Sequence, residues 1–134
     1  MAVNVFPTPV VSSKIRYQTT LLSGTSYTVP AGVTSLTVTC VGGGAANSSG
    51  TINNGGSTSF TGATTAAGGS NSYTAGIPAG NGSSVNTQYT TLAGDGQVTY
   101  STVSTSGGSA ITYAIGAAGS SPAGSGAILV EYWL

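Results

Sequence analysis

Residues 33–41 read VTSLTVTCV, and this stretch decides the fold class. Every second residue from Leu36 to Cys40 is apolar, and threonines stand between them. Because successive side chains of a β-strand point to opposite faces, this period of two predicts a strand with one face in a core. Cys40 lies on the apolar face and is expected to be a small buried hydrophobic residue.

Strand-like segments lie on both sides of this stretch, and turn residues such as Ser23-Gly24 separate them. No segment repeats apolar residues with the helical period of 3.6, and the abundance of Gly, Ser, Thr and β-branched residues disfavours helix. We therefore predict an all-β fold, either a β-sandwich or a jelly-roll-like barrel. The predicted strands are 14–22, 25–29, 33–41, 57–66, 85–93, 96–103, 109–116 and 126–134.

The closing segment, 126–134, reads GAILVEYWL and carries apolar residues on both of its faces. A strand that is covered on both sides belongs in the middle of a sheet or in an interface. We therefore expect this segment to be a central or interface strand.

The stretch 42–83 departs from the alternating pattern, because runs of glycine replace it. Glycine makes up 22 of the 134 residues, without the spacing at every third residue that collagen requires. We expect long, ordered glycine-rich loops with short strands, in which backbones approach closely in polyproline-II-like or tightly packed segments. A flexible, disordered linker is the alternative.

The first residues read MAVNVFPTPVVSS and show no alternation. Their prolines favour extended backbone, so we expect an extended N-terminal arm that docks on another protein, with a frayed terminus as the alternative. We divide the chain into 1–22, the anchoring arm with the first strand, and 23–134, the glycine-rich β-domain. The candidate assembly residues are Phe6, Pro7, Pro9, Val10, Val11, Lys14 and Arg16.

The inventory of ionisable residues excludes most catalytic chemistry. The chain has two Lys+Arg, two Asp+Glu and no His, so the usual Ser-His-Asp and Cys-His arrangements are impossible. The only carboxylate pair is Asp95 and Glu131; we interpret Asp95 as part of a hairpin turn, and Glu131 as a strand residue paired with Lys14 or Arg16. We predict no enzymatic activity, no metal site and no cofactor.

The same inventory bounds the partners. Two cations are too few for binding to nucleic acid, and no apolar run approaches the ~20 residues of a membrane span. No charged residue lies between Arg16 and Asp95, so this long neutral stretch must be hydrated by hydroxyl and amide groups or covered by neighbours. We expect a homo-oligomer, with a trimer favoured, that is made in the cytoplasm.

Four stretches carry a resemblance to a known family: SGTSYTVPAGVTSLTVTCVGGGAA (23–46), GGSTSFTGATTAAGG (55–69), ITYAIGAAGSSPAGSGA (111–127) and the terminal ILVEYW. Together they resemble the glycine-rich domain of tailed-phage virion proteins, especially tail fibres and adhesins. The resemblance covers roughly residues 23–133. It implies a β-rich, usually oligomeric virion component that is exposed on the particle and has no catalytic role.

Two functions follow as expectations. The first is a structural protein on the virion surface, a capsid decoration or head-fibre subunit that docks through the N-terminal arm on major capsid or tail proteins. The alternative is a tail-fibre tip or adhesin that binds a host surface glycan or protein through its glycine-rich loops, where tyrosines could stack on sugars. The candidate recognition residues are Asn53, Asn54, Asn71, Tyr73 and Asn81.

Overall fold

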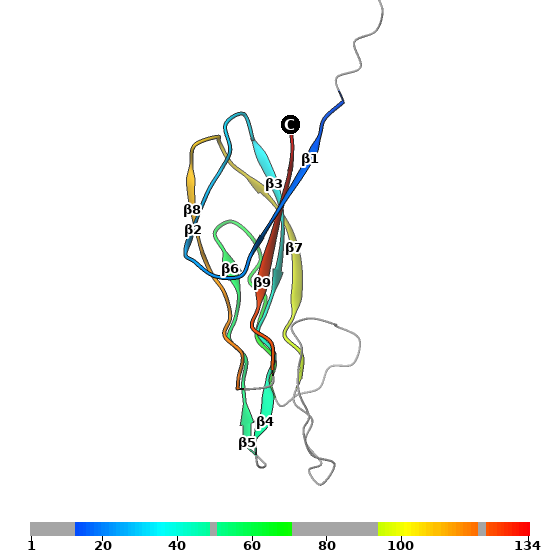
Figure 1. The fold of residues 1–134 in the computed structure, drawn as a ribbon, viewed down its shortest axis with the longest axis vertical. Coiled ribbons are helices and arrows are strands. Elements are labelled where there is room, and N and C mark those ends of the chain that lie inside the picture. The colour runs from blue at the N-terminus through cyan, green and yellow to red at the C-terminus, as the bar shows by residue number, and fades with distance from the viewer. Residues whose placement is uncertain (1–12, 49–50, 71–93, 121–122) are drawn as a thin grey trace, which may run out of the picture.

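A computed structural model describes residues 13–48, 51–70, 94–120 and 123–134. These residues contain strands and no helix, which confirms the prediction of an all-β fold. Figure 1 shows the strands arranged in an elongated molecule. The strands are β1 (Arg16–Leu21), β2 (Ser26–Thr28), β3 (Ser35–Val41), β4 (Ala46–Ser48), β5 (Thr51–Asn53), β6 (Ser59–Phe60), β7 (Val98–Ser104), β8 (Ala110–Ala114) and β9 (Ala127–Trp133).

The larger sheet has four strands in the order β1-β9-β3-β7, and each neighbouring pair is antiparallel. β9 therefore lies between β1 and β3, which confirms that the closing segment is a central strand. In β3 the apolar residues Leu36, Val38 and Cys40 are fully buried, as the alternation predicted. β1 forms one edge of this sheet and β7 the other.

The smaller sheet, β2-β8-β6, covers the inner face of the larger one, so the fold is a β-sandwich. Aromatic rings form part of the core between the sheets: the Phe60 ring lies 6.4 Å from the Tyr113 ring and 6.2 Å from the Tyr27 ring, measured between centroids. The buried cluster consists of Tyr27, Val29, Val33, Leu36, Val38, Cys40, Phe60, Ala66, Val103, Ile111, Tyr113, Ile128 and Val130.

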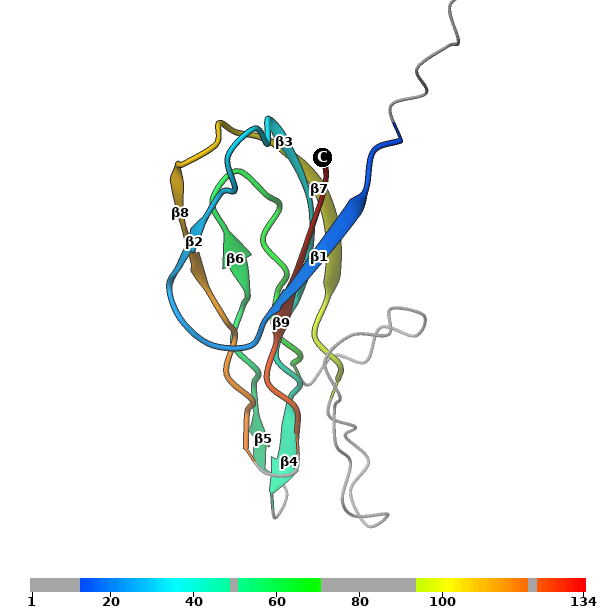
Figure 2. The ribbon, with the colours of Figure 1, turned by 45° about the horizontal axis from the view of Figure 1, so that its top comes forward.

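A third element, the hairpin β4-β5, lies at the end of the molecule opposite the C-terminus and the start of β1 (Figures 1 and 2). The segments that connect it to the sandwich follow β3 and precede β6 in the chain. The molecule thus has two ends of different construction, a sandwich with the chain's C-terminus and a glycine-rich end with the hairpin.

One predicted strand is much shorter in the structure, and another cannot be compared with it. The strand expected over 57–66 is reduced to β6, because the chain turns at Gly62, whose φ of 88° ends the extended backbone, and returns to pair Thr58 with Ala66. The strand expected over 85–93 lies outside the described residues. β1 pairs with β9 along its whole length, and the division of the chain at residue 22 stays a prediction.

Candidate functional site

The glycine-rich segments meet between the sandwich and the β4-β5 hairpin. We call the six segments 42–45, 55–58, 66–70, 94–97, 116–119 and 124–126 the glycine bundle. Segment 42–45 is at its centre, because its backbone forms hydrogen bonds with all five others. For example, Gly43 N donates to Gly56 O at 2.9 Å, while Gly43 O accepts from Gly69 N at 2.8 Å.

Hydrogen bonds that run between extended segments, rather than along a strand ladder, are the arrangement by which glycine-rich polyproline-II-like chains associate. In the bundle Gly55 N donates to Gly69 O, and Gly56 N donates to Ala117 O at 2.7 Å. The expectation of ordered, closely approaching glycine backbones is therefore confirmed for the described part of 42–83.

The bundle requires glycine because its segments lie too close together for a side chain. A Cβ atom placed on most of these glycines would approach the backbone of a neighbouring segment to under 3.0 Å, a separation that real Cβ atoms essentially never show. None of them has a positive φ, in contrast to the turn glycines of the sandwich, Gly24, Gly32, Gly62 and Gly108. The bundle glycines concerned are Gly42, Gly43, Gly55, Gly56, Gly68, Gly69, Gly96, Gly116, Gly119 and Gly126.

Thr58 joins the bundle to the sandwich. Its side chain is fully buried, and its Oγ1 accepts a hydrogen bond from the Gly116 N–H at 2.9 Å. Its backbone pairs with Ala66 at the start of β6. Thr58 was not a candidate in the sequence, where it is one of many threonines; only its place between a glycine run and Phe60 marks it.

Asp95 lies within the bundle, so the interpretation of Gly94-Asp95-Gly96 as a hairpin turn is wrong. Both flanking glycines are buried, and Ala45 N donates to Gly94 O at 3.0 Å. These glycines allow close approach of segment 42–45, while the Asp95 side chain is exposed.

The far end of the bundle carries the candidate recognition residues that the structure describes. Asn54 is exposed, and Asn53 is half-buried at the end of β5, where its carbonyl lies against Gly119. Gly94 N donates to Ser70 O at 2.9 Å, so the chain leaves and re-enters the bundle at adjacent points. The remaining candidates, Asn71, Tyr73 and Asn81, lie outside the described residues.

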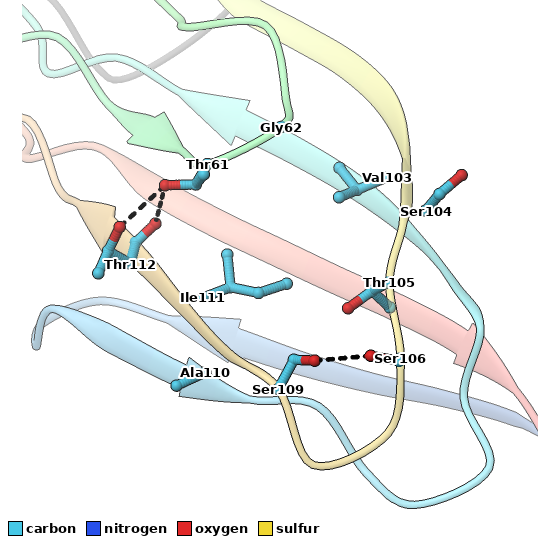
Figure 3. Close-up of a pocket in the computed structure, with 10 residues that line it drawn as sticks. All are labelled: Thr61, Gly62, Val103, Ser104, Thr105, Ser106, Ser109, Ala110, Ile111 and Thr112. Carbon is cyan, nitrogen blue, oxygen red and sulfur yellow. Dashed lines mark hydrogen bonds between the residues drawn. The ribbon is translucent and has the colours of Figure 1, made fainter.

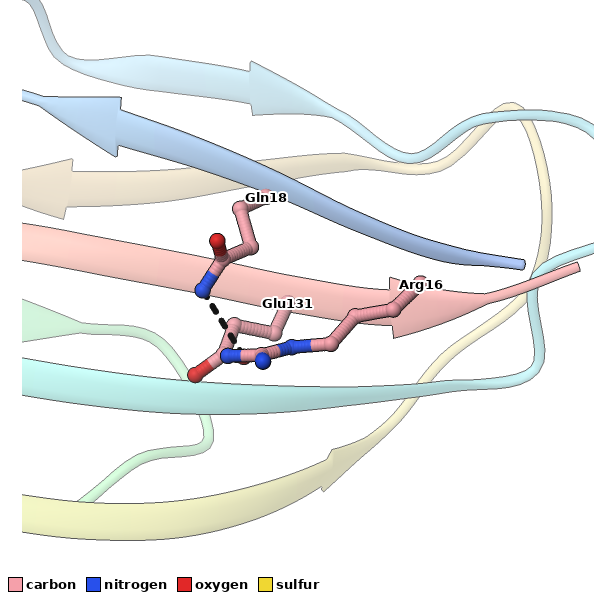
Figure 4. Close-up of polar contacts among 3 residues, drawn as sticks. All are labelled: Arg16, Gln18 and Glu131. Atoms are coloured by element: carbon pink, nitrogen blue, oxygen red, sulfur yellow. Dashed lines mark hydrogen bonds and ion pairs between the residues drawn. The ribbon is translucent and has the colours of Figure 1, made fainter.

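At the opposite end, the predicted ion pair of Glu131 is confirmed with Arg16 as the partner (Figure 4). Arg16 Nε donates to Glu131 Oε2 at 2.6 Å, and Gln18 Nε2 donates to the same oxygen at 3.2 Å. The Glu131 side chain is 12% exposed, so this carboxylate is held by its neighbours. Lys14 is exposed, and the arm candidates Phe6, Pro7, Pro9, Val10 and Val11 lie outside the described residues.

Exposed apolar side chains gather beside this ion pair. Four of the six large hydrophobic residues that the described chain exposes lie where β1 begins and β9 ends; the other two are Leu22, which follows the far end of β1, and Tyr100 on β7. We call these four the arm-end apolar group: Ile15 (59% exposed), Tyr17 (41%), Trp133 (46%) and Leu134 (45%).

A wide-mouthed cavity of about 610 Å³ opens on the sandwich near the ends of β7 and β8 (Figure 3). Val103 and Ile111 supply apolar surface, and hydroxyl groups line the rest. Two pairs of hydroxyls are bonded to each other, Thr61 with Thr112 and Ser106 with Ser109, both at 2.9 Å. None of the described residues that line this cavity has an ionisable side chain, so they offer hydrogen bonds and no acid–base group.

The tyrosines divide between the core and the surface. Tyr27 and Tyr113 are buried in the sandwich, Tyr113 donating to Ser23 O at 2.7 Å, and Tyr17 stacks on Tyr132 with the ring centroids 5.2 Å apart. Burial, with a smaller contribution from Tyr132, raises the pKa of Tyr27. Tyr100 is the most exposed of those described.

Cys40 is a free, buried thiol, as predicted. Burial raises its pKa, and a hydrogen bond with Thr99 opposes this shift. Among the described residues no group of three or more His, Cys, Asp or Glu side chains could hold a metal ion. The part of the chain that the structure describes also contains no helix long and apolar enough to cross a membrane.

Comparison with known proteins adds no relative: no family model, curated protein or solved structure matches the chain.

Proposed function

We propose that the chain is a non-enzymatic structural protein on the surface of a phage virion, a capsid decoration or head-fibre subunit that docks through its N-terminal end. The glycine bundle carries this proposal. Five of its six segments, all but 94–97, fall wholly or almost wholly in stretches that carry the resemblance to virion proteins, and the bundle holds them together by backbone hydrogen bonds. Such a bundle supplies shape and rigidity rather than reactive groups.

The difference between the two ends of the molecule supports docking through the N-terminal end. β1 begins beside the C-terminus, at the end of the molecule opposite the β4-β5 hairpin (Figure 2). The arm-end apolar group and the exposed Lys14 lie at that same end, which gives a partner both apolar and basic contacts. Apolar side chains gathered at one place on a surface are typical of interaction sites.

The test is to count copies of the chain in purified phage particles by quantitative mass spectrometry. Hundreds of copies per particle support a decoration protein, and absence of the chain from the particles overturns the proposal. Deleting residues 2–13 should abolish incorporation of the chain into particles. The shortened protein should still show the thermal unfolding transition of the full chain. A control deletion of residues 74–80, near the middle of the chain, should leave incorporation unchanged.

One observation favours a second candidate, an adhesin that binds a host surface glycan or protein through the glycine-rich loops. The β4-β5 hairpin follows a segment of the glycine bundle, and Ser70 and Gly94, which are hydrogen-bonded to each other, also belong to the bundle. For this candidate, replacing residues 74–80 should abolish adsorption of particles to cells, with normal copy number. A copy number of a few dozen or fewer would favour it over decoration.

A further inference from the structure

The outer edge of β1 presents unpaired backbone groups. Ile15 and Leu134 exchange both backbone hydrogen bonds, at 2.6 and 3.0 Å, so this pair faces each other directly across the ladder. In an antiparallel ladder such bonded pairs alternate with unbonded ones. The N–H and C=O groups of Arg16, Gln18 and Thr20 therefore point away from β9, and no other described residue bonds to them.

The two edges of the larger sheet differ in what covers them. At β7, the inner face is covered by the segment around Thr64, whose N–H donates to Ser101 Oγ at 2.9 Å and whose carbonyl accepts from Thr99 Oγ1 at 2.7 Å. At β1, all residues from Arg16 to Thr20 are exposed, and the arm-end apolar group lies at the start of the strand. β1 also lacks the proline or unpaired charge by which proteins protect an exposed edge, since its one charge, Arg16, is paired with Glu131.

We propose that β1 pairs antiparallel with β1 of a second copy of this chain across a two-fold axis at Gln18, which joins the two larger sheets into one. Two identical strands run antiparallel satisfy the same edge on both copies, which is the self-complementary geometry of a two-fold dimer. When the axis passes through Gln18, all three outward positions of β1 are paired. Gln18 faces Gln18 of the second copy, and Arg16 of each copy faces Thr20 of the other. Moving the axis by one residue, to Tyr17 or Thr19, pairs only two of these three positions with each other.

This register also suits the side chains. Arg16 would face a threonine rather than another cation, and a net charge of zero gives the two copies no mutual repulsion. On the inner face Ile15 would lie opposite Leu21 of the second copy, which covers one of the most exposed members of the arm-end apolar group. The proposal does not depend on the virion role, and it replaces the expected trimer with a dimer.

Proline on either edge of the sheet provides a matched pair of variants. On β7, Thr105 N donates to Thr34 O, so Thr105 is a bonded position of the ladder with β3. Bonded and outward positions alternate, so the Thr102 N–H points outward, as the Thr20 N–H does on β1. Proline at an outward position removes a donor and leaves the existing ladder intact. Sedimentation should give a mass of twice 12.9 kDa for the full chain and for T102P, and half of that for T20P.

A cysteine at the axis tests the register and does not depend on how the proline variants fold. Paired residues in a bonded antiparallel pair lie about 5.5 Å apart between Cα atoms, within the range that a disulfide spans. Gln18→Cys should therefore form a covalent dimer on mild oxidation, while Thr102→Cys and the buried native Cys40 should not. A wild-type chain that sediments as a monomer or trimer, or a T20P variant that stays dimeric, overturns the proposal, as does failure of Gln18→Cys to cross-link.

Discussion

The sandwich and the glycine bundle belong to one chain, yet they are stabilised in opposite ways. The sandwich is filled by side chains, with Phe60, Leu36 and Ile128 among the largest that are fully buried. The bundle contains few side chains larger than a methyl group, and its segments are joined by backbone hydrogen bonds. Burial of apolar area stabilises the first, at about 25 cal/mol per Å². Many small contributions of about 0.5–1.5 kcal/mol per hydrogen bond stabilise the second.

The two regions should therefore respond to opposite kinds of substitution. Removing atoms from the sandwich leaves cavities, and adding atoms to the bundle separates segments that must touch. Four predictions test this difference.

Adding one methyl group at the centre of the bundle should have the largest effect. In Gly43→Ala the new Cβ meets the Ala117 carbonyl group. This group belongs to the backbone, so it cannot move aside as a flexible side chain could. The segments must separate, which weakens the bonds of Gly43 to Gly56 and to Gly69 and leaves buried groups unsatisfied. We expect the free energy of unfolding to fall by about 4 kcal/mol or more, measured by urea denaturation.

Ala117→Ser is the matched control for this prediction. Its side chain is exposed on the outside of the bundle, so one added atom there meets no backbone, and the free energy of unfolding should change by about 0.5 kcal/mol or less. Equal losses in Gly43→Ala and Ala117→Ser would mean that close backbone approach does not stabilise the bundle.

Removing atoms from the sandwich should have the next largest effect. Leu36 is fully buried in β3, and Leu36→Ala loses apolar burial and leaves a cavity. We expect a loss of about 3 kcal/mol in the free energy of unfolding. Leu36→Met, which keeps the volume, should cost less than about 1.5 kcal/mol. A Met variant as unstable as the Ala variant would contradict the idea that volume alone decides this region.

The sequence predicted the sandwich better than the bundle, for a physical reason. Alternation of side chains records which face of a strand is buried, so the buried face of β3 and the central position of β9 followed from their residues. Glycine has no side chain to record a partner. The runs at 42–44 and 55–56 indicated close packing, but which segments meet is fixed by hydrogen bonds between positions far apart in the chain.

The wrong interpretation of Asp95 and the failure to identify Thr58 have the same cause. Asp95 between two glycines has the composition of a turn, yet its glycines serve close approach, and a single sequence does not distinguish the two uses. Thr58 was overlooked because a buried threonine and an exposed one have the same letter, and the chain is rich in threonine. The ion pair of Arg16 and Glu131 could be predicted because the chain offers so few charges to choose from.

The junction between the two regions should respond to the loss of a single hydrogen bond. Thr58→Val keeps the shape of the side chain and removes Oγ1, so the buried N–H of Gly116 loses its acceptor. An unsatisfied buried donor costs about 1–3 kcal/mol, and we expect an effect in this range by urea denaturation. Thr58→Ser, which keeps the oxygen, should recover about half or more of the loss. If Thr58→Ser is less stable than Thr58→Val, the methyl group and not the hydrogen bond holds the junction.

The smallest effect concerns the buried thiol, which gives the sandwich a pH dependence. Burial raises the pKa of Cys40 in the folded state, so an unfolded chain releases this proton at a lower pH than the folded chain does. The stabilisation is therefore complete below the pKa of an unfolded thiol, about 8.5, and is lost as the pH rises toward the folded value. Between pH 8 and pH 9.5 the wild type should lose up to about 1 kcal/mol that Cys40→Ala does not lose. Tyr27, whose pKa is also raised, acts with the same sign only nearer pH 10 and affects both proteins equally, so their difference isolates the thiol. Parallel urea-denaturation profiles of wild type and Cys40→Ala across this range would mean that the thiol ionises within the folded sandwich as readily as in water.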